Sequence, residues 1–122
     1  MGIAIKRVYE KPEEKDGARI LVDRLWPRGL TKKKAKIDLW LKEVAPSTEL
    51  RKWFGHEAPK WDEFQARYKN ELKNRGKELS SILEMAAQSQ VTLVYGAKDE
   101  VHNDAVLLQK ILLAKLKKTG AN

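Results

Sequence analysis

Three segments of the chain have the hydrophobic pattern of β-strands. Residues Ile3 to Tyr9 alternate between apolar and polar positions, which is typical of a half-buried strand. Arg19 to Asp23 encloses a short continuous apolar run, and Val91 to Tyr95 is rich in β-branched residues. Both runs predict strands that are covered on two faces. The charged segment between the first two strands is short for a parallel crossover, so the direction of the first strand stays open.

Helical patterns occupy most of the remaining chain. Thr31 can cap a short turn through Lys34, and Ser47 can cap a second short helix that ends at Gly55. A longer tract from Pro59 is interrupted at residues 74–76 and then resumes. Its two parts each carry an apolar stripe, made of Trp61, Phe64, Tyr68 and Leu72 and then of Leu79, Ile82, Leu83 and Ala86. The last helix is predicted over about residues 101–117, with Ala105, Leu108, Leu112 and Leu116 facing inward.

This order of elements predicts the fold class. The strands at 19–23 and 91–95 are separated by a long helical connection, so they are expected to lie parallel in one sheet. We therefore predict an α/β fold, in which a small, mostly parallel sheet of about three strands is packed with helices. The 122 residues are expected to form a single layered domain over 1–122.

Charge and composition narrow the class of partner. The chain has 25 lysine and arginine residues against 17 aspartate and glutamate residues, a net charge of +8. This excess favours an anionic partner, either a small anionic ligand or nucleic acid. The absence of cysteine excludes disulfides, thiolate catalysis and cysteine-ligated metal centres. No segment has the pattern of a secretory signal or the ~20 apolar residues of a membrane span, so we expect a cytoplasmic protein without a membrane partner. The oligomeric state is unknown from the sequence.

Ligand-binding chemistry is expected first in the loop after the second strand. Arg24 and Arg28 flank Trp26, and Pro27 stiffens the segment between them. Guanidinium groups suit phosphate or carboxylate, and the indole could stack on an apolar part of the ligand. In the alternative interpretation, Trp26 covers the sheet edge and the arginines pair with nearby carboxylates such as Asp23.

The loop after the last strand supplies a second group of candidates. Lys98 and Asn103 are predicted ligand-binding residues, and Asp99 is expected to cap the last helix. His102 could act as a general acid or base oriented by Asp99, so these two are the candidate catalytic residues. Alternatively, His102 is an exposed residue of the first helical turn. The acidic side chains Asp99, Glu100 and Asp104 oppose a highly charged anion directly at this helix end.

Arg51 and His56 are two further ligand-binding candidates, on and just after the second short helix. His56 and His102 are the two histidines of the chain, and neither lies in a paired metal-ligand motif. No metal and no cofactor are therefore predicted, although a magnesium site built from Asp23, Asp99 and Asp104 stays an alternative. The glycine spacing matches neither a dinucleotide-binding loop nor a phosphate-binding P-loop.

Three motifs together resemble the YeaO-like family, a bacterial and archaeal group within the wider domain of unknown function 488. They are Val22-Asp23-Arg24-Leu25-Trp26-Pro27-Arg28-Gly29, Ala45-Pro46-Ser47 with Leu50-Arg51-Lys52-Trp53-Phe54-Gly55-His56, and Tyr95-Gly96-Ala97-Lys98-Asp99 with His102-Asn103. The resemblance runs through nearly the whole chain and implies a parallel α/β domain with no established activity. Many members of the wider group carry a cysteine beside the final strand. Tyr95 or Gly96 occupies that place here, so a thiol role does not transfer.

Three function hypotheses follow. The first is a crevice at the carboxyl ends of the strands that binds, or acts on, a small phosphate or carboxylate ligand. The second is a basic nucleic-acid-binding module that uses the block Lys32 to Lys36 with Trp26. The third is a non-catalytic interaction protein anchored by Trp40 and Trp53. Whether the protein is an enzyme is left open at this point.

Overall fold

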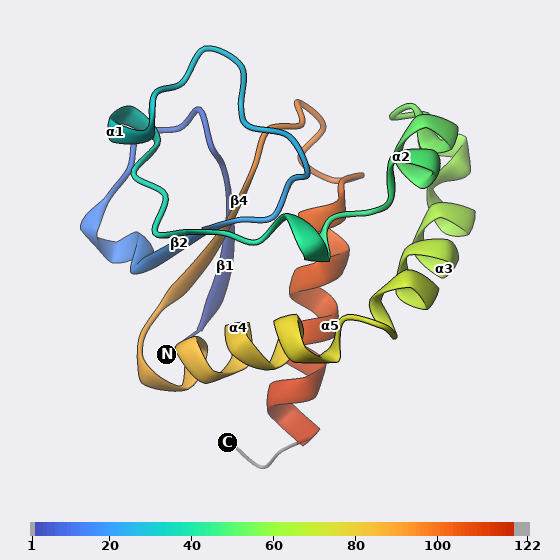
Figure 1. Cartoon of the computed structure of the whole chain (residues 1–122). Coiled ribbons are helices and arrows are strands. Elements are labelled where there is room, and N and C mark those ends of the chain that lie inside the picture. Colours follow the sequence, from blue (N-terminus) through green and yellow to red (C-terminus); the bar gives the residue numbers. More distant parts are fainter. Residues whose placement is uncertain (1, 119–122) are drawn as a thin grey trace.

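A four-stranded, all-parallel sheet lies at the centre of the computed structural model, which describes residues 2–118 (Figure 1). Its strands are β1 (Ile3–Arg7), β2 (Ala18–Leu21), β3 (Leu39–Trp40) and β4 (Val91–Tyr95), in the order β1–β4–β2–β3. The predicted α/β class and the parallel pairing of β2 with β4 are confirmed. The first strand, whose direction was open, pairs parallel to β4 with Ile3 opposite Val91.

One of the four strands, β3, was not predicted from the sequence. It contributes two residues, which pair with Ile20 and Leu21 of β2 at one edge of the sheet. A segment this short has no recognisable alternation of apolar and polar positions. Its pairing depends instead on the chain that returns past β2 after the short helix α1 (Lys32–Ala35).

The predicted helical segments are confirmed, with some changes at their ends. After α1, the helices are α2 (Thr48–Phe54), α3 (Trp61–Leu72), α4 (Gly76–Gln88) and α5 (Asp104–Lys118). Single 3-10 turns lie at η1 (Glu14–Asp16), η2 (Lys42–Val44) and η3 (Ala58–Lys60). Thr31 and Ser47 cap α1 and α2 as expected, and Gly55 ends α2 in a left-handed conformation at φ 54°.

The start of the last helix differs from the prediction. Asp99 does not cap α5, because its Oδ1 accepts the backbone N–H groups of Val101 and His102 within the preceding loop. Asn103 caps the helix instead: its Oδ1 accepts the N–H of Val106 at 3.0 Å. The helix therefore begins at Asp104 rather than near residue 101.

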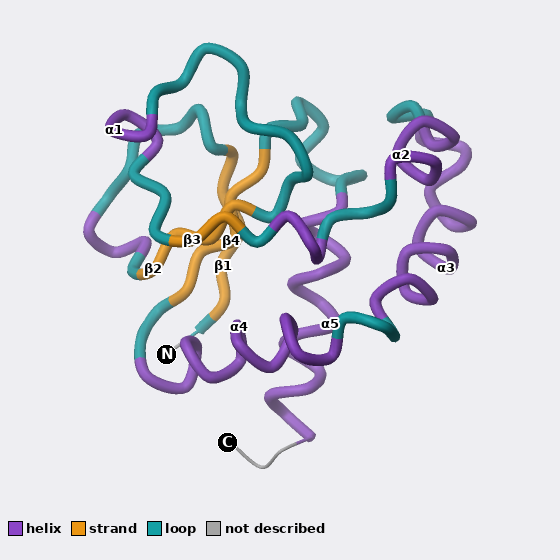
Figure 2. Tube along the Cα trace, in the orientation of Figure 1, coloured by secondary structure: helices purple, strands orange, loops and turns teal. Residues whose placement is uncertain are grey.

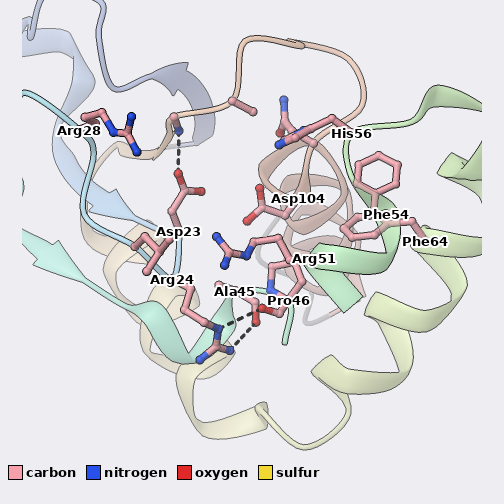
Figure 3. A pocket seen from close by; sticks show the side chains of 14 residues that line it. Asp23, Arg24, Arg28, Ala45, Pro46, Arg51, Phe54, His56, Phe64 and Asp104 are labelled. Carbon is pink, nitrogen blue, oxygen red and sulfur yellow. Dashed lines mark hydrogen bonds between the residues drawn. The ribbon is translucent and has the colours of Figure 1, made fainter. Parts of the chain in front are cut away.

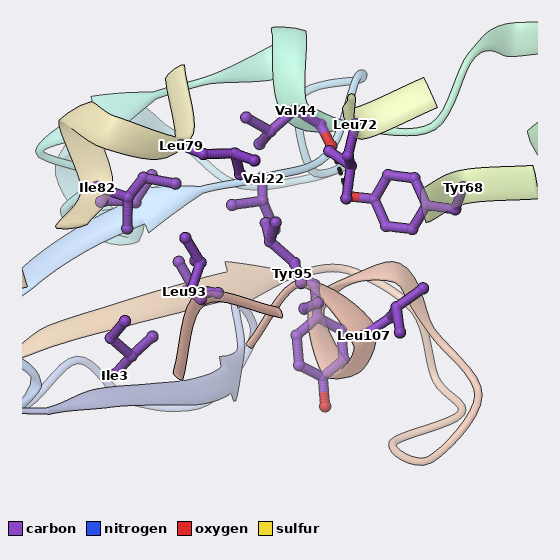
Figure 4. Close-up of a cluster of buried hydrophobic side chains, with 14 of the residues drawn as sticks. Ile3, Val22, Val44, Tyr68, Leu72, Leu79, Ile82, Leu93, Tyr95 and Leu107 are labelled. Carbon is purple, nitrogen blue, oxygen red and sulfur yellow. Dashed lines mark hydrogen bonds between the residues drawn. The ribbon is translucent and has the colours of Figure 1, made fainter. Parts of the chain in front are cut away.

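The two faces of the sheet are covered differently. Helices α4 and α5 pack on one face, and their buried side chains form part of the main hydrophobic core (Figure 1 and Figure 4). A smaller cluster on the other face contains Val8, Leu21, Ala35 and Val94, with Trp26, Leu30 and Ile37 packed against it. That face is covered by the long loop between β2 and β3 (Figure 2). No helix in residues 2–118 is long and apolar enough to cross a membrane.

A buried ionic network ties β1 to β2 beneath the charged loop. Asp16 accepts from Arg19 Nη1 at 2.7 Å and pairs with Lys6 Nζ at 3.1 Å. Its backbone carbonyl accepts the hydroxyl of Thr92 at 2.7 Å. Asp16, Lys6 and Arg19 therefore stabilise the fold, and their ionic network does not line the pocket at the carboxyl ends of β2 and β4.

Candidate functional site

A pocket of about 550 Å³ lies beyond the carboxyl ends of β2 and β4, where the predicted crevice was placed. The loops that follow these strands meet there, because Asp23 Oδ2 accepts the backbone N–H of Gly96 at 2.7 Å (Figure 3). The lining comes from both loops, from the turn before α2, and from α2, α3 and α5. It consists of Asp23, Arg24, Leu25, Arg28, Ala45, Pro46, Arg51, Phe54, His56, Phe64, Gly96, Ala97, Asn103 and Asp104.

Two carboxyl groups form the acidic part of the pocket. Burial raises the pKa of Asp23 from 3.8 to about 6, against the lowering effects of the Gly96 N–H and of Arg51 and His56. Burial also raises the pKa of Asp104 well above its ordinary value, and the nearby negative charge of Asp23 raises it further. Carboxyls with raised pKa values in a cleft are typical of binding and active sites.

Arg51 projects from α2 toward both carboxyl groups (Figure 3). Its position follows from the way in which the start of α2 is held: Ser47 caps α2 by accepting the N–H of Leu50 at 3.1 Å, and Glu71 of α3 accepts the hydroxyl of Ser47 at 2.6 Å. The Nε of Arg51 is buried and has no hydrogen-bond partner among the described residues. A buried donor without a partner costs about 1–3 kcal/mol, so a ligand oxygen at this position would be favoured.

Arg24 lines the same pocket but is held by the backbone. Its Nε and Nη2 donate to the carbonyl oxygens of Pro46 and Ala45 at 3.1 and 3.3 Å. These bonds fasten the turn before α2 to the loop after β2. Arg24 therefore shapes the wall and contributes charge, with part of its donor capacity already used.

Arg28 and His56 lie on opposite sides of the mouth (Figure 3). Both are exposed. His56 adopts a left-handed backbone conformation at φ 58°, directly after Gly55, and its ring lies 6.0 Å from that of Phe54. This tight turn places the imidazole over the pocket instead of continuing α2.

Five of the predicted site residues line the pocket, namely Arg24, Arg28, Arg51, His56 and Asn103. Trp26 lies elsewhere: its Nε1 donates to the carbonyl of Leu30 at 2.7 Å, and its ring packs edge-on against Trp40. Lys98 is exposed and does not line the pocket.

The candidate catalytic pair also lies outside the pocket lining. His102 Nδ1 and Asp99 Oδ2 are 2.9 Å apart, as the spacing suggested. The N–H groups of His102 and Val101, followed by the imidazole, lower the pKa of Asp99 to about 2. The His102 ring packs edge-on against Trp61. These contacts hold the loop before α5 in shape.

Two residues of the pocket, Asp23 and Asp104, were not predicted as ligand-binding residues. Asp23 ends the second apolar run and Asp104 stands at the helix start, so their positions could have indicated the crevice. Within residues 2–118, no three histidine or acidic side chains are grouped so as to hold a metal ion. The alternative magnesium site of Asp23, Asp99 and Asp104 is thus not assembled.

The fold and site define a small parallel α/β protein with an arginine- and aspartate-lined pocket at the carboxyl edge of its sheet. The chain belongs to the family described as the inactive DUF488-N3 subclade, whose model matches residues 2–122. It is 44% identical over 108 residues to the uncharacterized protein YeaO of Escherichia coli, a match that covers 88% of this chain and 94% of that protein. It is 37% identical over 110 residues to the uncharacterized protein Rv3073c of Mycobacterium tuberculosis, covering 90% and 92%. The resemblance to the YeaO-like family is thereby confirmed. No solved structure matches the chain.

Proposed function

We propose that this protein binds a small anion, a phosphate or carboxylate group, in the pocket at the carboxyl ends of β2 and β4. The observation that carries the proposal is the buried, unpartnered Nε of Arg51. A guanidinium offers parallel N–H donors that match the oxygens of such anions. Arg28 at the mouth supplies a second cation.

Binding without chemical conversion is the form of this function that we favour. The family description calls the subclade inactive. The pair formed by His102 and Asp99, which could have moved a proton, lies outside the pocket lining. The protein would then act as a sensor or carrier of its ligand.

The test is calorimetric titration with inorganic phosphate and with acetate, comparing two single variants of α2. Arg51→Gln removes the positive charge inside the pocket. Lys52→Gln removes the same charge from the next residue, which is exposed and does not line the pocket. We expect Arg51→Gln to weaken binding by about tenfold or more, as for loss of a charged hydrogen bond, and Lys52→Gln to change it little.

Thermal unfolding gives a second readout of the same titration. A ligand at about a hundred times its dissociation constant stabilises the folded state by about 2.7 kcal/mol. Equal effects of the two substitutions, or no binding by the unsubstituted protein at millimolar anion, would refute the proposed function.

Nucleic-acid binding is a second candidate, favoured by a different surface. Lys32, Lys33, Lys34 and Lys36 are all exposed on and just after α1. The half-exposed ring of Trp40 follows on the edge strand, with Lys42 Nζ 5.1 Å from its centroid. Lysines can neutralise phosphates, and an exposed indole can stack on a base.

This candidate is tested by fluorescence anisotropy with a labelled single-stranded oligonucleotide over a salt series. Alanine replacement of Lys32, Lys33 and Lys34 is compared with replacement of three lysines in the last turn of α5, Lys115, Lys117 and Lys118. Binding through the α1 surface should weaken steeply with salt and should be lost in the first triple variant. Binding that is insensitive to salt, or equally reduced in both variants, would exclude this surface.

A further inference from the structure

The floor of the pocket has a charge arrangement that a bare anion does not explain. Asp23 and Asp104 lie there on either side of the approach to Arg51 (Figure 3). The ion pairs found within residues 2–118 include none between Arg51 and either carboxyl group. The carboxyl groups of Asp23 and Asp104 and the Nε–H of Arg51 thus face the same space, and the Nε–H is hydrogen-bonded to neither carboxyl.

The hydrogen-bonding capacity of these groups selects the chemistry of a ligand. Asp23 uses Oδ2 for the N–H of Gly96, which leaves Oδ1 available. A carboxylate needs donors, whereas the Nε–H of Arg51 needs an acceptor. A hydroxyl group provides both at once and carries no charge. An ammonium group would satisfy the carboxyls but would be repelled by Arg51. A bare phosphate brings negative charge toward Asp23, so it is expected to bind more weakly than a ligand that places a hydroxyl there.

The remaining walls suit the carbon skeleton of a larger ligand. Phe54 and Phe64 line one side, with ring centroids 4.4 Å apart. Ala45 and Pro46 line another. A volume of about 550 Å³ is typical of organic-ligand pockets and exceeds what a single phosphate fills. Arg28 and His56 stand at the mouth, where an anionic end would emerge.

We propose that the ligand is a hydroxylated organic phosphate, such as a polyol or sugar phosphate, whose hydroxyl groups lie between Arg51 and the carboxyls of Asp23 and Asp104. Its phosphate lies toward Arg28 and His56 at the mouth of the same pocket. This assignment rests on the proposed anion-binding function and adds the part of the ligand that the aspartates recognise.

Three phosphates of similar size test the assignment by calorimetry. Glycerol 3-phosphate carries two hydroxyls, propyl phosphate carries none, and phosphoethanolamine carries an ammonium group in their place. We expect glycerol 3-phosphate to bind about tenfold or more tightly than propyl phosphate, as for a hydroxyl bonded to charged partners. Phosphoethanolamine is expected to show no such advantage.

Variants of the acidic residues separate this inference from the function on which it rests. Asp104→Ala should abolish most of the preference for glycerol 3-phosphate, while propyl phosphate binds about as well as before because it has no hydroxyl for this carboxyl to bond. The variant should fold, since the buried carboxyl it removes opposes folding at neutral pH. Glu100→Ala is the control, because it removes an exposed carboxyl from the loop just before α5.

The outcomes are distinct. Equal affinity for glycerol 3-phosphate and propyl phosphate, both dependent on Arg51, would overturn the hydroxyl assignment and leave the anion site standing. A preference for phosphoethanolamine would overturn it in favour of a zwitterionic ligand. A preference for glycerol 3-phosphate that survives Asp104→Ala and Asp23→Asn would also overturn it. No binding of any of the three would remove the proposed function together with this inference.

Discussion

Replacing Asp23 by asparagine should stabilise the folded protein at neutral pH. At acidic pH the same substitution should leave the stability close to that of the unsubstituted chain. Burial raises the pKa of Asp23 to about 6, so the folded state holds its proton more tightly than the unfolded chain does. As pH rises from about 4 through 6, the unfolded chain releases this proton first. The stability of the native protein therefore falls over that window.

The magnitude follows from the same shift. A rise of the pKa from 3.8 to about 6, at about 1.4 kcal/mol for each pH unit, corresponds to about 3 kcal/mol at most. Asparagine keeps an oxygen that can accept the N–H of Gly96, the bond that joins the two loops at 2.7 Å. The substitution thus removes the charge and retains the contact.

Urea unfolding at a series of pH values measures this effect. We expect Asp23→Asn to match the unsubstituted protein near pH 4 and to exceed it by up to about 3 kcal/mol at pH 7.5. Glu84→Gln is the control, because Glu84 is exposed on α4. A stability difference between Asp23→Asn and the parent that stays constant across the series would show that Asp23 titrates as an ordinary carboxyl, and would refute the reasoning.

Three further predictions concern the site and the fold. Sulfate, whose charge is constant over this range, should bind more tightly as pH falls from about 7.5 to 5.5 because Asp23 becomes neutral. Calorimetry in a His56→Gln background removes the imidazole at the mouth from the comparison, and an unchanged affinity would contradict the prediction. Tyr68→Phe should lower the free energy of unfolding by about 1–2 kcal/mol, because the buried Tyr68 hydroxyl donates to the carbonyl of Val44 (Figure 4). An unchanged stability in urea unfolding would mean that this carbonyl finds another donor. Gly17→Ala should lower the free energy of unfolding by about 3 kcal/mol or more, because Gly17 has φ 64° and an added Cβ would lie 2.1 Å from the carbonyl oxygen of Gln90. Urea unfolding measures this loss, and an unchanged stability would show that the turn can relax.

The elements that could be predicted are those with a local pattern. The apolar run Val91–Tyr95 is β4 to the residue, and the Ser47 cap and Gly55 ending bound α2 as expected. Each of these signals acts through neighbouring residues in the chain. The strand β3 and the hydrogen bond from the Thr92 hydroxyl to the carbonyl of Asp16 depend on distant segments, so no local pattern indicated them.

The site was predicted in part for the same reason. Parallel strands place their carboxyl ends at one edge, and this rule alone brought Arg24, Arg28 and Asn103 to the same pocket. Trp26 lies in the same loop, but its side chain packs against the apolar cluster that contains Leu21 and Val94. The direction of a side chain within a loop depends on such packing, which sequence spacing does not contain.

The most direct test of the account is the NMR signal of the Arg51 side-chain Nε–H during a phosphate titration. We predict one resonance, absent from Arg51→Lys, that shifts saturably with phosphate at the affinity measured by calorimetry. The Nε–H of Arg19 is the internal reference, because it already donates to the carbonyl oxygens of Ala35 and Lys36 at 3.2 Å and should not move. An Arg51 signal that stays in place while phosphate binds, or one that moves no more than that of Arg19, would contradict the assignment of the anion to this pocket.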